Sequence, residues 1–161
     1  MTRLLVAAVG RLKADGERVL ADRYLDRAGK AGGQLGFTLA LRETAESRAA
    51  RDLDRKREES AALLAAVPAG AILVALDERG SAIRSEDFAT RLGAWRDEGH
   101  ADIVFLIGGA DGLDPDLVST ARLKLALGAM TWPHQLVRVM VLEQIYRAFT
   151  ILAGHPYHRG G

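Results

Sequence analysis

The chain has 161 residues, with 22 basic and 21 acidic side chains, 48% hydrophobic residues and no cysteine. This length indicates one domain, residues 1–161, and the lack of cysteine excludes disulfides, thiolate metal sites and a cysteine nucleophile. A formal charge of +1 argues against a protein that holds bare nucleic acid by charge alone, because phosphate contacts dominate such binding. Neither a signal peptide nor an unbroken apolar stretch of ~20 residues is visible, so we expect a cytoplasmic protein without a membrane span.

The first half of the chain alternates short apolar runs with longer mixed segments. We predict strands at residues 3–9, 36–41 and 71–76, helices at residues 17–28 and 47–67, and a closing turn at Asp77-Glu78-Arg79-Gly80. The charged stretch at residues 48–59 has spacings that permit pairing one helical turn apart. We interpret it as a solvated helix face, with an RNA-contacting face as the alternative.

The second half continues the alternation. We predict a helix from Ser85, acting as its cap, to Asp97, and a strand at residues 102–107. A short helix follows, with Asp114 as cap and Pro115 as first residue, then a strand at residues 123–127 and a final helix beginning at Pro133. Because the strands are continuous apolar runs separated by helices, the pattern indicates a single-domain α/β fold whose parallel sheet is covered on both faces.

Three loops follow strands and therefore qualify as ligand sites, since parallel sheets bind ligands beyond the carboxyl ends of their strands. They come after Leu76, Ile107 and Leu127. The second loop, Gly-Gly-Ala-Asp-Gly, allows the backbone to approach a ligand closely, although a plain tight turn explains it equally well. The chain has neither GxGxxG nor GxxxxGK[ST], which argues against an ordinary dinucleotide oxidoreductase and a P-loop hydrolase.

The C-terminal segment is the most informative part of the chain. An almost entirely apolar helix, interrupted only by a few polar residues, runs into the polar tail His155-Pro156-Tyr157-His158-Arg159. Such a helix needs a deep core position or a partner surface, so we expect the tail to be fixed and to cover a pocket formed by the three loops. With four histidines, no cysteine and no HExxH, no metal site is expected.

Three segments closely resemble the SPOUT-class ribosomal RNA methyltransferases, and within them the large-subunit methyltransferase H family. They are LDERG (residues 76–80), LIGGADGL (106–113) and MTWPHQLVRVMVLEQIYRAFTILAGHPYHR (130–159). The resemblance implies an α/β/α sandwich with a C-terminal trefoil knot, an exception to the rule that chains are not threaded. It also implies S-adenosylmethionine as cofactor, a homodimer in which the partner completes each site, and methylation of N3 of a pseudouridine in 23S rRNA within the assembled ribosome.

By motif match, the resemblance assigns the cofactor contacts to Leu76, Gly108, Leu127, Gly128, Ala129, Met130, Thr131 and Trp132. Read from the residues alone, Thr131 caps the last helix and Trp132 is either a packed lid or a flat wall for a purine ring. The chain departs from the family at Ala126 and Gly128, where serines are common. Backbone contacts to the cofactor would survive this change, whereas a hydroxyl contact would not.

Methylation of an imide nitrogen requires loss of its proton, so a base or a stabilising cation is expected near the acceptor. Glu143 and Arg147 share a helix face, and an ordinary ion pair is the alternative interpretation. We predict Arg147, Tyr157 and His158 as catalytic residues, without assigning the base. We predict RNA contacts for Arg138, His155 and Arg159, because guanidinium groups suit phosphates. A contact to a dimer partner is the alternative for Arg138. Tyr157 is suited to stack on a base or to relay a proton, since stacking is how exposed loop bases are commonly held.

Two other functions remain open from the sequence. One is a non-catalytic ribosome-associated binding factor, which would not bind S-adenosylmethionine. The other is a methyltransferase of the same class that acts on tRNA.

Overall fold

Five parallel strands form one sheet in the computed structural model, which describes residues 1–159. The strands are β1 (Thr2–Val9), β2 (Phe37–Thr44), β3 (Ile72–Ser81), β4 (Asp102–Ile107) and β5 (Leu123–Leu125), in the order β2-β1-β4-β3-β5. The helices are α1 (Gly16–Gly33), α2 (Asp52–Ala65), α3 (Ser85–Asp97), α4 (Pro115–Ser119) and α5 (His134–Ala153). The predicted α/β class with a parallel sheet is confirmed.

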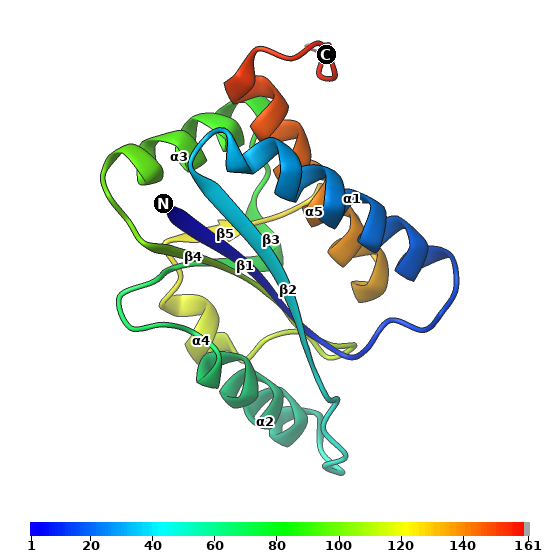
Figure 1. The fold of residues 1–161 in the computed structure, drawn as a ribbon. Coiled ribbons are helices and arrows are strands. Elements are labelled where there is room, and N and C mark those ends of the chain that lie inside the picture. Colours follow the sequence, from blue (N-terminus) through cyan, green and yellow to red (C-terminus); the bar gives the residue numbers. More distant parts are fainter. Residues whose placement is uncertain (160–161) are drawn as a thin grey trace.

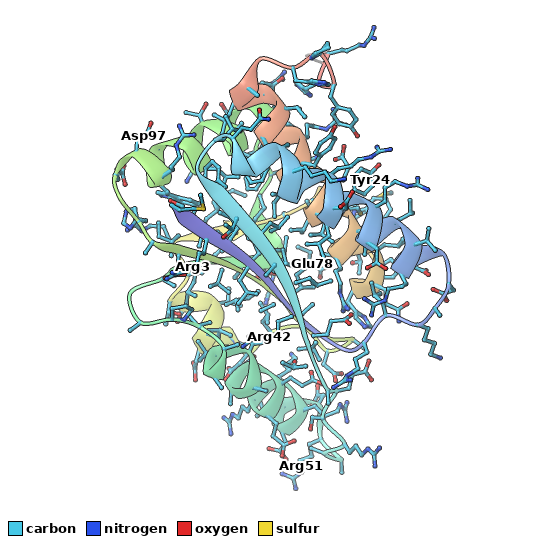
Figure 2. The ribbon with its side chains drawn as sticks, viewed as in Figure 1. Arg3, Tyr24, Arg42, Arg51, Glu78 and Asp97 are labelled. Atoms are coloured by element: carbon cyan, nitrogen blue, oxygen red, sulfur yellow. The ribbon has the colours of Figure 1, made fainter. Side chains whose placement is uncertain are left out.

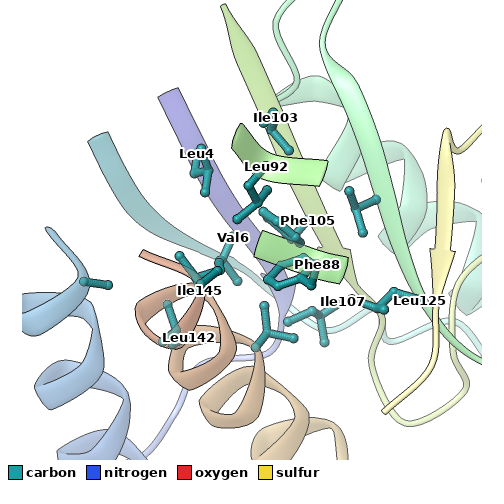
Figure 3. Close-up of a cluster of buried hydrophobic side chains, with 14 of the residues drawn as sticks. Leu4, Val6, Phe88, Leu92, Ile103, Phe105, Ile107, Leu125, Leu142 and Ile145 are labelled. Atoms are coloured by element: carbon teal, nitrogen blue, oxygen red, sulfur yellow. The ribbon is translucent and has the colours of Figure 1, made fainter. Parts of the chain in front are cut away.

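Helices cover both faces of the sheet (Figure 1), with α1, α3 and α5 on one side and α2 and α4 on the other. Tyr24 on α1 and Arg51 beside the start of α2 mark these two layers in Figure 2. Side chains alternate between the two faces along a strand, so β1 sends Leu4 and Val6 into one core and Ala7 into the other. The larger core, shown in Figure 3, joins β1 and β4 to α3 and α5.

The position of each strand in the sheet explains its burial. β4 lies in the centre and all six of its residues are buried, as the continuous apolar run predicts. β2 lies at an edge, and its burial largely alternates along the strand. Large apolar side chains pack the helices onto the sheet. For example, Phe88 of α3 lies against Phe105 of β4, with ring centroids 6.0 Å apart.

Some predicted helix starts were wrong for local reasons. α2 begins at Asp52 rather than at residue 47, because the Ser47 N–H donates to the Glu59 carboxylate at 2.9 Å and residues 47–51 run outside the helix. Ser85 is not the cap of α3; its hydroxyl donates instead to Gln144 of α5 at 2.8 Å. The predicted cap of α4 is confirmed, since the Asp114 carboxylate accepts from the backbone N–H two residues on.

β3 continues beyond the predicted turn. Leu76 and Ser81 both pair with Leu125, so residues 77–80 bulge out of the ladder rather than ending the strand. Gly80 lies so close to β5 that a Cβ there would be 2.5 Å from the carbonyl oxygen of Lys124. β5 is correspondingly shorter than predicted, and residues 126–133 form a loop. The trefoil knot expected from the resemblance stays a prediction.

Candidate active site

A cavity of about 490 Å³ lies where the carboxyl ends of β3, β4 and β5 meet. This volume is typical of a small-molecule site. The lining includes all but one of the predicted cofactor contacts, namely Leu76, Gly108, Leu127, Gly128, Met130, Thr131 and Trp132. The exception is Ala129, which lies in the same loop. The three loops therefore come together in one pocket, as the sequence predicts.

The loop after β4 needs its glycines. A Cβ on Gly108 would lie 2.6 Å from the carbonyl carbon of Gly112 and 2.8 Å from the N of Leu113, closer than real Cβ contacts come. Gly112 has φ +86, in the region that favours glycine, and its N–H donates to the Gly109 carbonyl at 3.0 Å. The loop thus folds back on itself and exposes backbone to the cavity.

The loop after β5 forms the opposite wall. Gly128 has φ +105, and the indole N–H of Trp132 donates to the Leu127 carbonyl at 3.1 Å, which fixes the ring beside the cavity. Thr131 does not cap α5, which has no side-chain cap. Its hydroxyl donates to the Glu78 carboxylate at 2.6 Å, so the bulge of β3 and the third loop are joined across the pocket.

Charged side chains of both signs line the cavity. The acids are Asp77, Glu78 and Asp111, and the bases are Lys56, Arg79 and Lys124. A ligand with both cationic and anionic groups can place each group near a side chain of opposite charge. A purely anionic ligand would be repelled by the three carboxylates. The apolar wall of Leu127 and Trp132 adds a surface for an aromatic ring.

The predicted catalytic residues form a second cluster, on the outer end of α5. Arg147 donates to the Glu143 carboxylate from Nε at 3.0 Å and from Nη2 at 2.5 Å. The Tyr157 hydroxyl donates to the same oxygen at 3.0 Å, and the Arg147 guanidinium lies 4.9 Å from the centre of the Tyr157 ring. His158 completes the cluster by bridging Arg147 to Glu86 of α3, with distances of 3.1 Å and 2.8 Å.

The proton positions in this cluster follow from its donors. Arginine has no acceptor, so Nδ1 of His158 accepts from Arg147 and Nε2 carries the proton that is donated to Glu86. The hydrogen bond from His158 holds the pKa of the Glu86 carboxyl below its ordinary value. Burial, together with the hydrogen bond to Glu143 and its negative charge, raises the pKa of Tyr157 to about 12. Tyr157 is therefore protonated at neutral pH.

The expectation that the tail covers the pocket of the same chain was wrong. None of Arg147, Tyr157 and His158 lines the cavity at the strand ends, because the tail is fastened to α3 and α5 by the bonds described above. A second cavity of about 450 Å³, lined mainly by apolar side chains, borders this cluster at Glu143. It shares Leu125, Leu127 and Gly128 with the first cavity, so the two cavities meet at β5 and the start of the third loop.

The predicted RNA contacts lie in different environments. His155 and Arg159 are exposed, as contact with RNA requires. The prediction for Arg138 was wrong, because its side chain is fully buried and donates to the carbonyls of Gly10 and Val9 at 2.9 and 3.0 Å and to the carboxylate of Glu43. Arg138 instead joins α5 to the ends of β1 and β2.

Sequence reasoning missed Glu86 and Glu43, the partners of His158 and Arg138. They lie 72 and 95 residues from those partners along the chain, and no local spacing signals such a pairing. Within residues 1–159, no cluster of three metal-binding side chains occurs. The helices of this same range all fall short of the length and apolarity needed to cross a membrane.

A parallel α/β fold with a glycine-walled pocket at the carboxyl edge of its sheet is the arrangement in which doubly wound α/β proteins bind their ligands. Comparison with known proteins narrows this further: the family model described as "Predicted SPOUT methyltransferase" matches residues 2–158. The chain belongs to the SPOUT methyltransferase family and is an enzyme of that class.

Similar proteins share nearly the full length of the chain. It is 64% identical over 159 residues to "Ribosomal RNA large subunit methyltransferase H" of Nitrobacter winogradskyi, covering 98% of this chain and 99% of the relative. It is 58% identical over 158 residues, with the same coverage, to the protein of that name from Rhizobium etli. A solved "probable methylase family protein" from Haemophilus influenzae Rd KW20 is 13% identical with a TM-score of 0.48, and the match covers 99% of this chain and 70% of that one.

Proposed function

We propose that the protein methylates N3 of a pseudouridine in 23S rRNA of the large ribosomal subunit, in the cytoplasm, using S-adenosylmethionine. The observation that carries the proposal is the meeting of the three motif-bearing loops in one pocket, combined with the near-full-length identity to enzymes named for large-subunit rRNA methylation. The near-neutral chain suits a substrate that is positioned by the ribosome rather than by charge.

The pocket fits S-adenosylmethionine in shape and charge. Gly108 lets the loop after β4 pack tightly against its own backbone at the cavity wall, and Trp132 offers a flat wall for the adenine. The mixed charges of the lining suit a ligand with a sulfonium, an ammonium and a carboxylate. When bound, this cofactor supplies an electrophilic methyl group attached to a sulfonium sulfur. The sulfur is the leaving group and becomes a neutral thioether.

The cluster on α5 would act on the acceptor base. When N3 gives up its proton to solvent water, the imide becomes negatively charged, and this charge is lost again as the bond from N3 to the methyl carbon forms. The Arg147 guanidinium is suited to stabilise the anionic imide. The Tyr157 hydroxyl and the His158 ring are already hydrogen-bonded to Glu143, Glu86 and Arg147, so we assign both residues to orienting Arg147 and the tail. His155 and Arg159, exposed beside them, would contact RNA.

Completion of the site requires a second copy of the chain. In one chain the α5 cluster is separate from the cofactor pocket, so a homodimer in which one protomer's tail meets its partner's pocket would unite them. The apolar second cavity, with Val139 and Met140 in its lining, supports this arrangement. Light scattering on purified protein tests it directly, and a monomer that is fully active at nanomolar concentration would contradict it.

The decisive experiment is mass spectrometry of ribosomal RNA from cells with and without the gene. Loss of one methyl group on a 23S pseudouridine, restored by the wild-type gene, is expected. Unchanged rRNA together with a methyl group lost from tRNA would instead identify a tRNA enzyme. Calorimetry with S-adenosylmethionine separates the third outcome, since a non-catalytic binding factor would show no heat of binding.

A further inference from the structure

The glycine loop after β4 has little of its own to hold it in shape. Its only internal backbone bond among the described residues joins Gly112 to Gly109. Glycine-rich backbone loses more conformational freedom on ordering than any other. If the loop were free, that entropy would be lost each time a ligand bound and would weaken the affinity.

Arg55 of helix α2 holds this loop without lining the pocket itself. The Arg55 guanidinium makes two bonds to the Asp111 carboxylate, Nε to Oδ2 at 2.7 Å and Nη2 to Oδ1 at 3.2 Å. Its third nitrogen, Nη1, donates to the carbonyls of Ala49 and Ala50, both at 3.1 Å. The Arg55 guanidinium is thus held by backbone carbonyls on one side and by Asp111 on the other. The paired bonds to both carboxylate oxygens fix the direction of the Asp111 side chain.

Two further contacts from α2 reach the same loop. Glu59 is buried, and its Oε1 lies only 3.2 Å from the point where a Cβ of Gly109 would be. Ser60 accepts a 2.9 Å hydrogen bond from the N–H of Asp114, where the loop enters α4. The charged face of α2 that the sequence suggested was solvated therefore includes a set of contacts to the loop.

We propose that Arg55 is a positioning residue for cofactor binding, acting through Asp111 to hold the glycine loop in its binding shape before the ligand arrives. Asp111 lines the pocket, whereas Arg55 does not. The inference rests on the proposed use of this pocket for S-adenosylmethionine. It assigns to Arg55, which does not line the pocket, an effect on affinity that acts through Asp111.

The test is a double-mutant cycle on the affinity for S-adenosylmethionine, measured by calorimetry on the full chain. Arg55→Ala and Asp111→Ala are each expected to raise Kd about tenfold, and the double variant no further than Asp111→Ala alone, because residues that act through one another are not additive. Arg55→Lys, which keeps the charge but loses the fork, should fall in between. Arg57→Ala, an exposed arginine on the same helix, is the matched control and should bind as the wild type does.

Hydrogen exchange of residues 108–114 in the free protein gives a readout that does not depend on the ligand. Faster exchange in Arg55→Ala than in Arg57→Ala, with similar melting temperatures, is expected if the loop loosens locally. Wild-type protein that binds S-adenosylmethionine, with Arg55→Ala binding equally well, would overturn this inference alone. Wild-type protein that does not bind it at all would overturn the proposed function and, with it, the role of Arg55.

Discussion

The hydroxyl of Tyr157 in the C-terminal tail donates a 3.0 Å hydrogen bond to Oε1 of Glu143, the oxygen that Arg147 also contacts. One carboxylate thus orients both the tail and the guanidinium proposed to face the acceptor base. The bond keeps Tyr157 as a proton donor, since burial and Glu143 together raise its pKa to about 12.

Tyr157→Phe removes this hydrogen bond and keeps the ring. We expect the turnover number to fall about tenfold, as for loss of one hydrogen bond to a charged group, with unchanged affinity for S-adenosylmethionine. Because Tyr157 does not ionise near neutrality, the rate profiles of the wild type and the variant should have the same shape up to about pH 10. A limb near neutral pH that disappears in Tyr157→Phe would instead make Tyr157 the titrating base.

Arg147→Ala should lower methylation at least about a hundredfold, the usual effect of removing a group that stabilises developing charge. Cofactor affinity should stay within twofold or so of the wild type, because Arg147 does not line the pocket at the strand ends. Single-turnover assays and calorimetry measure the two quantities separately. Arg91→Ala, an exposed arginine on α3, serves as control, and full turnover by Arg147→Ala would refute the catalytic role.

Gly108→Ala and Gly29→Ala form a matched pair. At Gly108 the new methyl would lie 2.6 Å from the carbonyl carbon of Gly112, whereas at Gly29 nothing lies within 4 Å. We expect Gly108→Ala to cost about 1–3 kcal/mol of stability through overpacking and to weaken cofactor binding at least about tenfold. Gly29→Ala, inside α1, should leave binding unchanged and gain up to about 1 kcal/mol. Urea unfolding and calorimetry test both, and equal cofactor affinities in the two variants would contradict the close approach at Gly108.

Glu43 should make the fold sensitive to acid. Burial by itself raises the pKa of this carboxyl, but hydrogen bonds from the Leu12 N–H and Arg18 and the charge of Arg138 outweigh it, so the net pKa lies below the ordinary value. A depressed folded-state pKa contributes stability that is present above the unfolded value near ~4.3 and is lost as pH falls through the folded value.

Glu43→Gln should therefore cost about 3 kcal/mol at pH 7, because the buried Arg138 loses its partner, and the cost should shrink as pH falls below about 4. Urea unfolding between neutral and acidic pH measures this difference. Glu98→Gln, at an exposed pair with His100, is the control and should change stability little. A cost for Glu43→Gln that stays constant with pH would show that the carboxylate charge is not what stabilises this position.

Features encoded by neighbouring residues were predictable from the sequence. The bounds of β4 and α3 agree with their apolar runs and flanking polar residues, and the three motif-bearing loops meet because parallel strands share one carboxyl edge. The positions that sequence analysis misjudged depend on distant partners. Arg138 was predicted to contact RNA, but it is surrounded by the carbonyls of Gly10 and Val9 and the carboxylate of Glu43.

The same limit explains the misjudged α2. Its charged residues satisfy the spacing rules of a solvated face, yet Arg55 binds Asp111, 56 positions later in the chain. The tail shows the other kind of limit. Its residues lie together beside α3 and α5, but no local spacing shows that they lie apart from the pocket of their own chain.

The buried Arg138 has a consequence for how the chain folds. Its two hydrogen bonds to backbone carbonyls join residues that are 128 and 129 positions apart. Contacts of such sequence separation slow folding, because the chain loses the entropy of closing a long loop before the contact can stabilise it. The guanidinium must also shed its water before the carbonyls and Glu43 can replace it. We therefore expect refolding to be slow, with α5 docking as a late step, and any chain trapped before that step would expose the most apolar helix of the protein to aggregation.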